Sequence, residues 1–275
     1  MPELPEVEIT RRGIEPWLLG STVSGVRIRQ PRLRYPVPEA LSALLEGRQV
    51  LAVRRRAKYL LIDFAQGALL IHLGMSGSLR VLPLGSVPEK HDHFDLELGS
   101  HVLRLRDPRR FGAVLWLPAG ELTHPLLASL GLEPLEEGFG GKALAQLLAG
   151  RRTPVKLAIM DSHLLVGVGN IYASESLFRA RIHPATPAGR LGPARCARLA
   201  EEIRLTLEDA LAAGGSTLRD FVHSDGSPGY FQQQYFVYGR DGEPCRVCGR
   251  GIERTIMAQR ATFHCPRCQR KPSGS

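Results

Sequence analysis

The second residue of the chain, Pro2, could act as a nucleophile. Aminopeptidases readily remove an initiator methionine that precedes a small residue, and Pro2 would then carry a free secondary amine. An α-amino group titrates at about pH 7.7–8.0, so a useful fraction is neutral at physiological pH. A neutral amine can attack a sugar or aldehyde carbon and form a Schiff base. Glu3, and Glu6 one helical turn further on, are candidate proton-transfer groups.

The same residue types also suit an ordinary helix start. Proline fits the first turn of a helix, and glutamate is stabilised near the positive end of the helix dipole. From this stretch alone the structural interpretation is the stronger one. The rest of the chain therefore has to decide between the two.

Four cysteines near the C-terminus have the spacing of a zinc site. Cys245 and Cys248 form one Cys-x-x-Cys pair, Cys265 and Cys268 form another, and sixteen residues separate the pairs. Each pair offers two thiolates to one tetrahedral ion, and the intervening residues are enough for a β-hairpin. Because four cysteines leave no open coordination position, we expect one structural Zn²⁺. The fifth cysteine, Cys196, is expected to fill the core.

The charge of the chain indicates a polyanionic partner. The 275 residues include 36 Lys and Arg against 27 Asp and Glu, which gives a formal net charge of +9. The zinc segment, residues 245–271, is especially basic, and nucleic acid is the first candidate partner. An anionic membrane surface is the runner-up, but no basic amphipathic terminal helix or lipidation motif supports it. No apolar run approaches membrane-spanning length, and the N-terminus lacks the apolar core of a signal peptide. We therefore expect a cytoplasmic protein with no membrane contact.

Two glycine-flanked turns could insert side chains into a nucleic acid. The turn at 107–112 holds Arg109, which could contact a base edge or phosphate, and Phe111, which could wedge into a base stack. The alternative is an Asp-Pro turn with Phe111 in the core, and the sequence leaves the two open. Met75 is similar, because it could be exposed for insertion or could merely fill a gap.

Two other motifs could contact phosphate. The glycines of the 167–172 segment precede Asn170, which we predict to cap a helix, and such a turn exposes backbone N–H groups to an anion. His91 and His93 resemble a metal-ligand pair on one face of a strand. Because no third ligand is evident, a phosphate contact or a solvated face is preferred.

The periodicity of the chain changes from β to α along its length. A helix is expected over residues 5–19, and eight short apolar runs between residues 22 and 117 predict the strands of a sandwich or barrel. Helices are expected further on, over residues 142–149, 155–160 (with Thr153 as N-cap), 170–180 and 193–213.

Taken together, these stretches resemble the formamidopyrimidine-DNA glycosylase family, which includes endonuclease VIII relatives. The resemblance covers nearly the whole chain, and the ordered set of motifs is highly specific. The motifs are Met1–Glu8, Arg55–Leu60, His72–Gly77, Asp107–Gly112, Gly167–Tyr172 and the Cys245–Cys268 finger with Gln259-Arg260-Ala261. Leu4, the Met-Ser-Gly loop and the segment 216–238 resemble the 8-oxoguanine branch of the family.

The resemblance implies an α+β multidomain fold. We expect an N-terminal catalytic β-sandwich domain with flanking helices (residues 1–132), a helix-two-turn-helix domain with a lesion-recognition loop (133–238, loop 216–238), a zinc-finger β-hairpin (239–270) and a short tail (271–275). The protein is expected to act as a monomer.

The resemblance also implies catalytic roles. Pro2 would attack C1′ of the damaged nucleotide, and Glu3 would transfer protons during base loss and ring opening. Lys58 would donate a proton for β-elimination and contact phosphate. Arg260, at the tip of the zinc hairpin, would contact phosphate and assist δ-elimination, and Glu6 would organise the site.

Further residues would contact DNA by the same resemblance. The candidates for phosphate contacts are His91, Arg151, Asn170, Lys156 and Tyr172; Arg151 stands where lysine is often found.

Extrusion of a nucleotide leaves a gap in the base stack. Met75 and Phe111 would fill that gap, and Arg109 would bond to the orphaned cytosine.

The sequence therefore predicts a bifunctional DNA glycosylase and AP lyase that repairs oxidised purines in bacterial duplex DNA, associated with the nucleoid. The rival activity is endonuclease VIII-like excision of oxidised pyrimidines. A rival of another class is a non-catalytic zinc-ribbon protein that binds nucleic acid.

Overall fold

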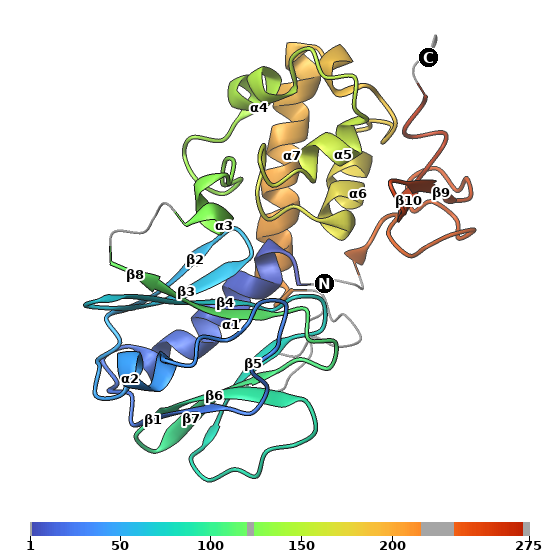
Figure 1. Ribbon diagram of the computed structural model, residues 1–275. Coiled ribbons are helices and arrows are strands. Elements are labelled where there is room, and N and C mark those ends of the chain that lie inside the picture. The colour runs from blue at the N-terminus through green and yellow to red at the C-terminus, as the bar shows by residue number, and fades with distance from the viewer. Residues whose placement is uncertain (1, 120–123, 216–233, 272–275) are drawn as a thin grey trace. The chain divides into compact units, whose positions relative to one another are not determined.

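The structure is a computed structural model that describes residues 2–119, 124–215 and 234–271. The chain divides into two compact units (Figure 1). Unit 1 contains the residues up to Ala128 and a segment that begins at Ala213; unit 2 contains Ser129–Ala212 and the residues from Phe231 onward. Most of the predicted lesion-recognition loop, residues 216–233, lies outside the described residues. No described helix is both long and apolar enough to span a membrane.

Unit 1 is built on two antiparallel four-stranded sheets. One has the strand order β1-β6-β7-β5, and the other has the order β2-β3-β4-β8. The strands are β1 (Gly25–Ile28), β2 (Ala52–Arg56), β3 (Tyr59–Phe64), β4 (Gly67–His72), β5 (Ser78–Pro83), β6 (Asp92–Leu98), β7 (His101–Arg106) and β8 (Ala113–Pro118). These eight strands of the described chain correspond to the eight predicted apolar runs. The sandwich is therefore confirmed.

The alternation of side chains along the strands explains how the sheets share a core. Leu60 and Ile62 on β3 belong to the same buried cluster as Leu69 and Ile71 on β4. The strands pair antiparallel, and residues two apart point to the same face. Phe94 on β6, in the other sheet, joins this cluster, so apolar burial holds the two sheets together.

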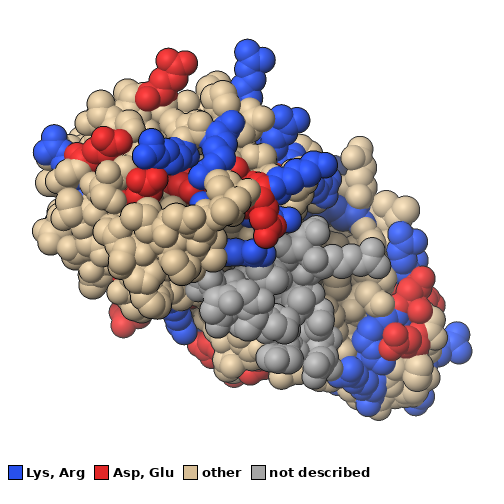
Figure 2. Space-filling model, turned by 90° about the horizontal axis from the view of Figure 1, so that it is seen from below, with Lys and Arg blue, Asp and Glu red and all other residues tan. Residues whose placement is uncertain are grey.

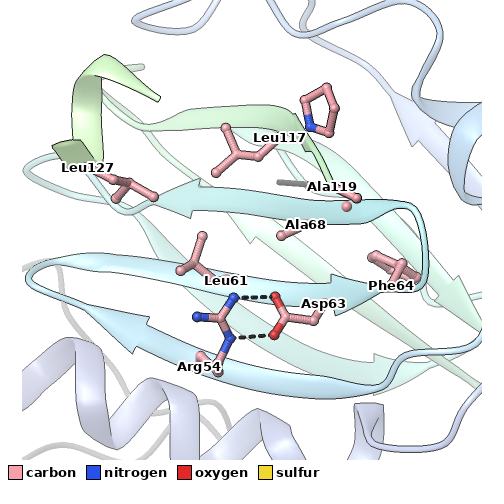
Figure 3. Close-up of a pocket in the computed structure, with 10 residues that line it drawn as sticks. Arg54, Leu61, Asp63, Phe64, Ala68, Leu117, Ala119 and Leu127 are labelled. Carbon is pink, nitrogen blue, oxygen red and sulfur yellow. Dashed lines mark hydrogen bonds and ion pairs between the residues drawn. The ribbon is translucent and has the colours of Figure 1, made fainter. Parts of the chain in front are cut away.

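The outer face of the β2-β3-β4-β8 sheet carries a shallow apolar hollow beside the short helix α3 (Pro125–Ala128). A cavity of about 260 Å³ is lined by Leu61, Ala68, Leu117 and Leu127 among others (Figure 3). The paired side chains of Arg54 and Asp63 lie at its edge. None of the residues predicted for catalysis lines this hollow.

Unit 1 also contains the helices α1 (Leu4–Leu18) and α2 (Leu41–Leu45). Helix α1 begins one residue earlier than predicted, and α2 is a short connection. Val7, Ile14 and Leu18 lie along one side of α1 and are buried in the sandwich core. Their spacing at i, i+7 and i+11 places them on one helix face, so the core fixes the orientation of the N-terminal helix.

Unit 2 is helical, with a two-stranded hairpin near its end. Its helices are α4 (Gly141–Leu148), α5 (Val155–Ile159), α6 (Asn170–Arg179), the 3₁₀ turn η1 (Ala188–Arg190) and α7 (Pro193–Ala212). The hairpin consists of β9 (Glu253–Met257) and β10 (Arg260–His264). Helix α7 packs against α4 and α6. Cys196 is fully buried on α7, as predicted for core filler.

Two predicted helix caps in unit 2 are wrong by one residue. Helix α5 has Pro154 rather than Thr153 at its N-cap, and α6 has Gly169 rather than Asn170. The extended backbone of Gly169 starts α6, so the side chain of Asn170 is released for other partners.

Candidate catalytic and nucleic-acid-binding sites

The N-terminus of α1 holds two carboxylates in the interior. Pro2 is buried, Glu3 is 3% exposed and Glu6 is fully buried. Oε2 of Glu6 accepts the N–H of Glu3 at 2.8 Å, and the Glu3 carboxylate accepts the N–H of Glu6, which forms a capping box. The structural and functional interpretations of this stretch are therefore compatible, because capping also fixes both carboxylates next to Pro2.

The chain returns to this helix start after α7. Gly215 has a φ of +76°, and a Cβ at this position would lie 3.1 Å from Cδ1 of Ile9 and 3.3 Å from Oε1 of Glu6. A larger residue would be both crowded and strained, since L-residues rarely adopt this backbone conformation. The residues that lead into segment 216–233 therefore lie against Glu6.

The hairpin that carries Lys58 is attached to α1 by charged side chains. Lys58 lies in the two-residue turn between β2 and β3, after Ala57, which has a φ of 54°. Nε of Arg55 on β2 donates to Oε2 of Glu8 at 3.2 Å, and NH1 of Arg11 donates to the carbonyl of Val53 at 3.1 Å. The helix that presents Pro2 and the turn that presents Lys58 are thus linked by direct bonds within unit 1.

The charges around this attachment set the protonation of Glu8. Burial alone would raise its pKa, but Arg12, Arg11 and Arg55 together hold the pKa of Glu8 below its ordinary value. Glu8 is therefore ionised at neutral pH and accepts hydrogen bonds from all three arginines.

His72 lies at the end of β4, opposite Tyr59, the residue that follows Lys58. Burial, followed by the positive charges of Arg34 and Lys58, lowers the pKa of His72 to about 4. Nδ1 of His72 accepts the N–H of Gly74 at 3.0 Å, so the neutral ring carries its proton on Nε2. A neutral histidine adds no positive charge beside Lys58.

The candidate insertion residues lie on two loops of unit 1. Phe111 is 43% exposed and Met75 is 39% exposed, which resolves the open alternatives in favour of surface positions. Cζ of Arg109 lies 4.9 Å from the ring centroid of Phe111, within the range of a cation–π contact. Exposed apolar side chains next to a guanidinium match the chemistry of base-stack insertion.

His91 and His93 do not form a metal site. His91 has a φ of 83°, and Nε2 of His93 donates to the carbonyl of Asp107 at 2.9 Å. Within the described chain, the cluster of potential metal ligands is the four cysteines. His91 is partly exposed, as a phosphate contact requires.

The four cysteines fit a zinc ion. Their sulfur atoms lie within 4.8 Å of one another, with Sγ–Sγ distances of 3.9 Å for Cys245–Cys268 and 3.5 Å for Cys248–Cys265. Tetrahedral coordination with Zn–S bonds of about 2.3 Å requires sulfurs about 3.8 Å apart. The donor set therefore suits one structural Zn²⁺.

The zinc hairpin is packed onto α6. Its Phe263 and Ile252 share a buried cluster with Phe178 of α6, and Nε2 of Gln269 donates to the carbonyl of Ile182 at 2.9 Å. Arg260, the first residue of β10, remains exposed at the hairpin turn, where it was predicted to contact phosphate.

Lys156 joins the helices of unit 2 to this hairpin. Its Nζ donates to Oδ1 of Asn170 at 2.6 Å, to Oγ1 of Thr262 at 2.7 Å and to the carbonyl of Ala261 at 3.1 Å. Nδ2 of Asn170 also donates to the carbonyl of Ala261, at 2.9 Å. Asn170 is partly exposed, so its amide can still face a phosphate from this fixed position.

Two predicted DNA contacts are buried in this structure. Lys156 is fully buried and Tyr172 is 1% exposed. Neither side chain presents a surface to a phosphate group. For Lys156 the geometry instead indicates an internal role, in which it places Asn170 and the turn before Arg260.

Arg151 lies in a basic hollow of unit 2. A cavity of about 490 Å³ is lined by Arg151, Arg152 and Arg190 together with Gly150, Pro187 and Gly189. No acidic residue is among these lining residues. Basic and acidic side chains are interspersed on the face of the molecule in Figure 2, so a hollow lined by arginines without acids is a distinct feature.

Some residues that shape the sites were missed by sequence reasoning. Arg55 was named only as part of the motif Arg55–Leu60 and was given no role, although the alternation along β2 could have indicated its partly buried position. Glu175 was not considered at all. Its buried carboxylate accepts the N–H groups of Phe236, Val237 and Tyr238 at 2.8–3.0 Å and fixes the chain that precedes the zinc module.

Known proteins match the chain over almost its whole length. Residues 1–114 match the formamidopyrimidine-DNA glycosylase N-terminal domain, residues 130–222 the H2TH domain of the same enzyme, and residues 242–270 a zinc finger found in FPG and IleRS. The formamidopyrimidine-DNA glycosylase of Aromatoleum aromaticum is 60% identical over 271 residues, which cover 98% of this chain and 100% of that protein.

Solved structures agree with this result. The crystal structure of MutM (FPG) from Thermus thermophilus has a TM-score of 0.88 and 43% identity, and the match covers 98% of each chain. A Lactococcus lactis FPG mutant in complex with a Fapy-dG containing DNA has a TM-score of 0.92 and 33% identity, and the match covers 98% of this chain and 100% of that one. The fold and sites define a DNA glycosylase with a zinc finger. The chain belongs to the formamidopyrimidine-DNA glycosylase family.

Proposed function

We propose that this chain is a bifunctional DNA glycosylase and AP lyase that removes oxidised purines, namely 8-oxoguanine and formamidopyrimidines, from duplex DNA. The observation that carries the proposal is the buried Pro2-Glu3 start of α1, attached through Glu8 and Arg55 to the hairpin of Lys58. The protein acts as a monomer on damaged double-stranded DNA in the bacterial cytoplasm, at the nucleoid.

Base removal begins with Pro2. Once Met1 is removed, the secondary amine of Pro2 attacks C1′ of the damaged nucleotide; the new C–N bond forms as the bond to the base breaks. The departing base gains a proton, and Glu3 transfers protons as the sugar ring opens to the Schiff base. The carboxylate of Glu6 accepts the N–H of Glu3 at 2.8 Å and so helps to hold Glu3 in place.

Strand cleavage follows from the Schiff base. Loss of the C2′ proton allows β-elimination of the 3′ phosphate, and δ-elimination then releases the 5′ phosphate. Lys58 donates a proton and contacts phosphate, while Arg260 contacts the flanking phosphate and assists the second elimination. The product is a one-nucleotide gap with phosphate at both ends.

Access to the nucleotide requires its extrusion from the base stack, which costs a few kcal/mol. Met75 and Phe111 fill the gap, and Arg109 bonds to the orphaned cytosine. Their exposure, and the contact of Arg109 with the Phe111 ring, support this role.

Phosphate contacts hold the duplex. His91 of unit 1 and Arg151 and Asn170 of unit 2 are partly or fully exposed polar residues suited to this task.

Four thiolates would hold the zinc ion, which supplies rigidity and no chemistry, because the cysteines fill all its positions. Chelation should weaken DNA binding, as should Cys248→Ser; wild-type affinity after complete zinc removal would exclude the finger from the interface.

Borohydride trapping tests the central proposal. Protein with Met1 removed, confirmed by intact mass, should form a covalent adduct with a duplex that contains 8-oxoguanine. Pro2→Gly should cleave this duplex at least about a hundredfold more slowly while still binding it, because the secondary amine of proline is replaced by the less nucleophilic primary amine of glycine. Absence of an adduct would leave the non-catalytic zinc-ribbon alternative, and unchanged nicking by Pro2→Gly would exclude Pro2 as the nucleophile.

A second comparison separates the two repair activities. Excision of 8-oxoguanine should be faster than excision of thymine glycol from otherwise identical duplexes. The opposite order would favour the endonuclease VIII-like activity.

A further inference from the structure

A buried carboxylate joins the two loops that carry the insertion residues. Asp107 is fully buried. Its Oδ1 accepts the hydroxyl of Ser76 at 2.9 Å, and its Oδ2 accepts the N–H of Gly112 at 2.7 Å. Ser76 directly follows Met75 in the chain, and Gly112 directly follows Phe111. One carboxylate therefore holds the residue next to each apolar insertion side chain.

Ser76 extends the connection to the arginine. Its Oγ accepts the N–H of Arg109 at 3.2 Å while its hydroxyl hydrogen is donated to Asp107. The backbone of Asp107 also bonds to the segment of His91: its N–H donates to the carbonyl of His91 at 3.0 Å, and its carbonyl accepts Nε2–H of His93 at 2.9 Å. Asp107 is thus bonded to both insertion loops and to the segment of His91.

The backbones of the two loops are also in close contact. A Cβ on Gly74 would lie 2.4 Å from the carbonyl carbon of Phe111 and 2.5 Å from the nitrogen of Gly112. Gly74 has a φ of +62°, so any side chain there would be strained as well as obstructed. The loops therefore fit together in a single arrangement, which leaves little freedom for one to move without the other.

We propose that Asp107 and Ser76 are positioning residues that hold the two loops as one rigid unit, so that Met75, Arg109 and Phe111 enter the base stack together. The inference rests on the proposed insertion role of these three residues. A rigid pair of loops needs no ordering when the nucleotide leaves the stack, whereas loose loops would have to become ordered at that step.

Ser76→Ala removes one of the two side-chain bonds of Asp107 with minimal change of shape. We expect single-turnover excision of 8-oxoguanine to slow about tenfold, because the insertion step loses its preorganisation. Elimination at a preformed abasic site should change by less than about twofold, because that nucleotide has no base to unstack. Ser176→Ala is the matched control, since its hydroxyl is equally buried and bonds a carbonyl, that of Tyr172, at 2.6 Å in unit 2.

A double-mutant cycle connects the effect to insertion. Phe111→Ala should itself slow excision, and Ser76→Ala should add little to it if Ser76 acts through Phe111. The fluorescence of 2-aminopurine beside the lesion should report reduced unstacking in each single variant. Asp107→Asn keeps the shape of the side chain but places an NH₂ group opposite one of the two donors, so one hydrogen bond is lost. This variant should therefore reproduce the Ser76→Ala pattern.

The possible failures are distinguishable. Wild-type excision by Phe111→Ala would exclude its insertion role and leave the catalytic proposal for Pro2 untouched. Impaired Phe111→Ala together with wild-type excision and fluorescence in both Ser76→Ala and Asp107→Asn would overturn the positioning proposal. Equal loss of excision and abasic-site elimination, or full additivity in the cycle, would also overturn it.

Discussion

The side-chain nitrogen of Lys156 lies 2.6 Å from Oδ1 of Asn170, in the interior of unit 2. The ammonium group also bonds to Thr262 and to the carbonyl of Ala261, so its three donors meet three neutral oxygen acceptors. One buried cation thereby connects α5, the start of α6 and strand β10. The position of Asn170 and the hairpin turn of Arg260 therefore depend on a residue that touches neither the solvent nor any predicted substrate atom.

Replacing Lys156 should loosen this connection. Lys156→Met keeps the apolar stem but removes the donor to Oδ1 of Asn170 and Oγ1 of Thr262, while the carbonyl of Ala261 keeps its bond from Asn170, so the free energy of unfolding should fall by about 2–4 kcal/mol. Zinc should remain bound, while DNA affinity should decrease because Asn170 and Arg260 are no longer held. Chemical denaturation and zinc titration measure these effects. Lys142→Met, at an exposed position, is the control, and equal stability of the two variants would contradict the role of Lys156.

The attachment of α1 to the Lys58 hairpin offers a second prediction. Arg55 and Arg12 both bond to Glu8, but Arg55 comes from β2 whereas Arg12 is four residues along the same helix. Arg55→Met should therefore slow strand cleavage about tenfold by displacing Lys58, and substrate affinity should fall less, because Lys58 supplies only one of several phosphate contacts. Arg12→Met should leave the cleavage rate within about twofold, because exposed helix pairs contribute little. Equal single-turnover cleavage rates for Arg55→Met and Arg12→Met would show that the attachment does not position Lys58.

His72 predicts how stability depends on pH. Its pKa is about 4 in the folded protein, against an ordinary value of 6.5, because of burial and then the charges of Arg34 and Lys58. As pH falls below 6.5 the unfolded chain takes up a proton before the folded one, so stability decreases toward pH 4.

The measurement is the free energy of unfolding at several pH values between 4 and 7. His72→Asn should make the decrease shallower over this interval. A remaining slope is expected from His183, whose pKa is also lowered to about 4 by burial and then by the charges of His264 and Lys271. Identical slopes in the wild type and His72→Asn would contradict the prediction.

Local sequence patterns predicted the helices and strands well, because the periodicity of apolar residues and the placement of Pro and Gly depend on neighbouring residues only. The strands follow from apolar alternation, and α1 and α7 follow from helical periodicity with Pro and Gly near their ends. Phe111 shows the limit of such rules. An Asp-Pro turn looks the same whether the following aromatic is buried or exposed, and only the close packing of Gly74 against the turn decides it.

The tertiary partners of polar residues could not be obtained in this way. Asn170 was predicted to cap its helix because asparagine is a common N-cap residue. Its actual partners are Lys156, fourteen positions earlier, and Ala261, ninety-one positions later. The burial of Lys156 depends on the same long-range contacts, so the family resemblance by itself suggested a phosphate contact instead. The catalytic assignments to Pro2, Glu3, Lys58 and Arg260 remain predictions.

The basic hollow of unit 2 leads to a final prediction about salt dependence. Arg152 and Arg190 line the same cavity as Arg151, so all three guanidinium groups can share in binding the DNA backbone. Each phosphate contact contributes about 0.9 to the slope of log affinity against log salt concentration. Arg152→Gln and Arg190→Gln should each reduce this slope by up to about one, and abasic-site elimination by saturating protein should be unchanged. Arg198→Gln, on the exposed surface of α7, serves as the charge-matched control. If all three variants lower the slope equally, the effect is one of net charge and the hollow is not a phosphate site.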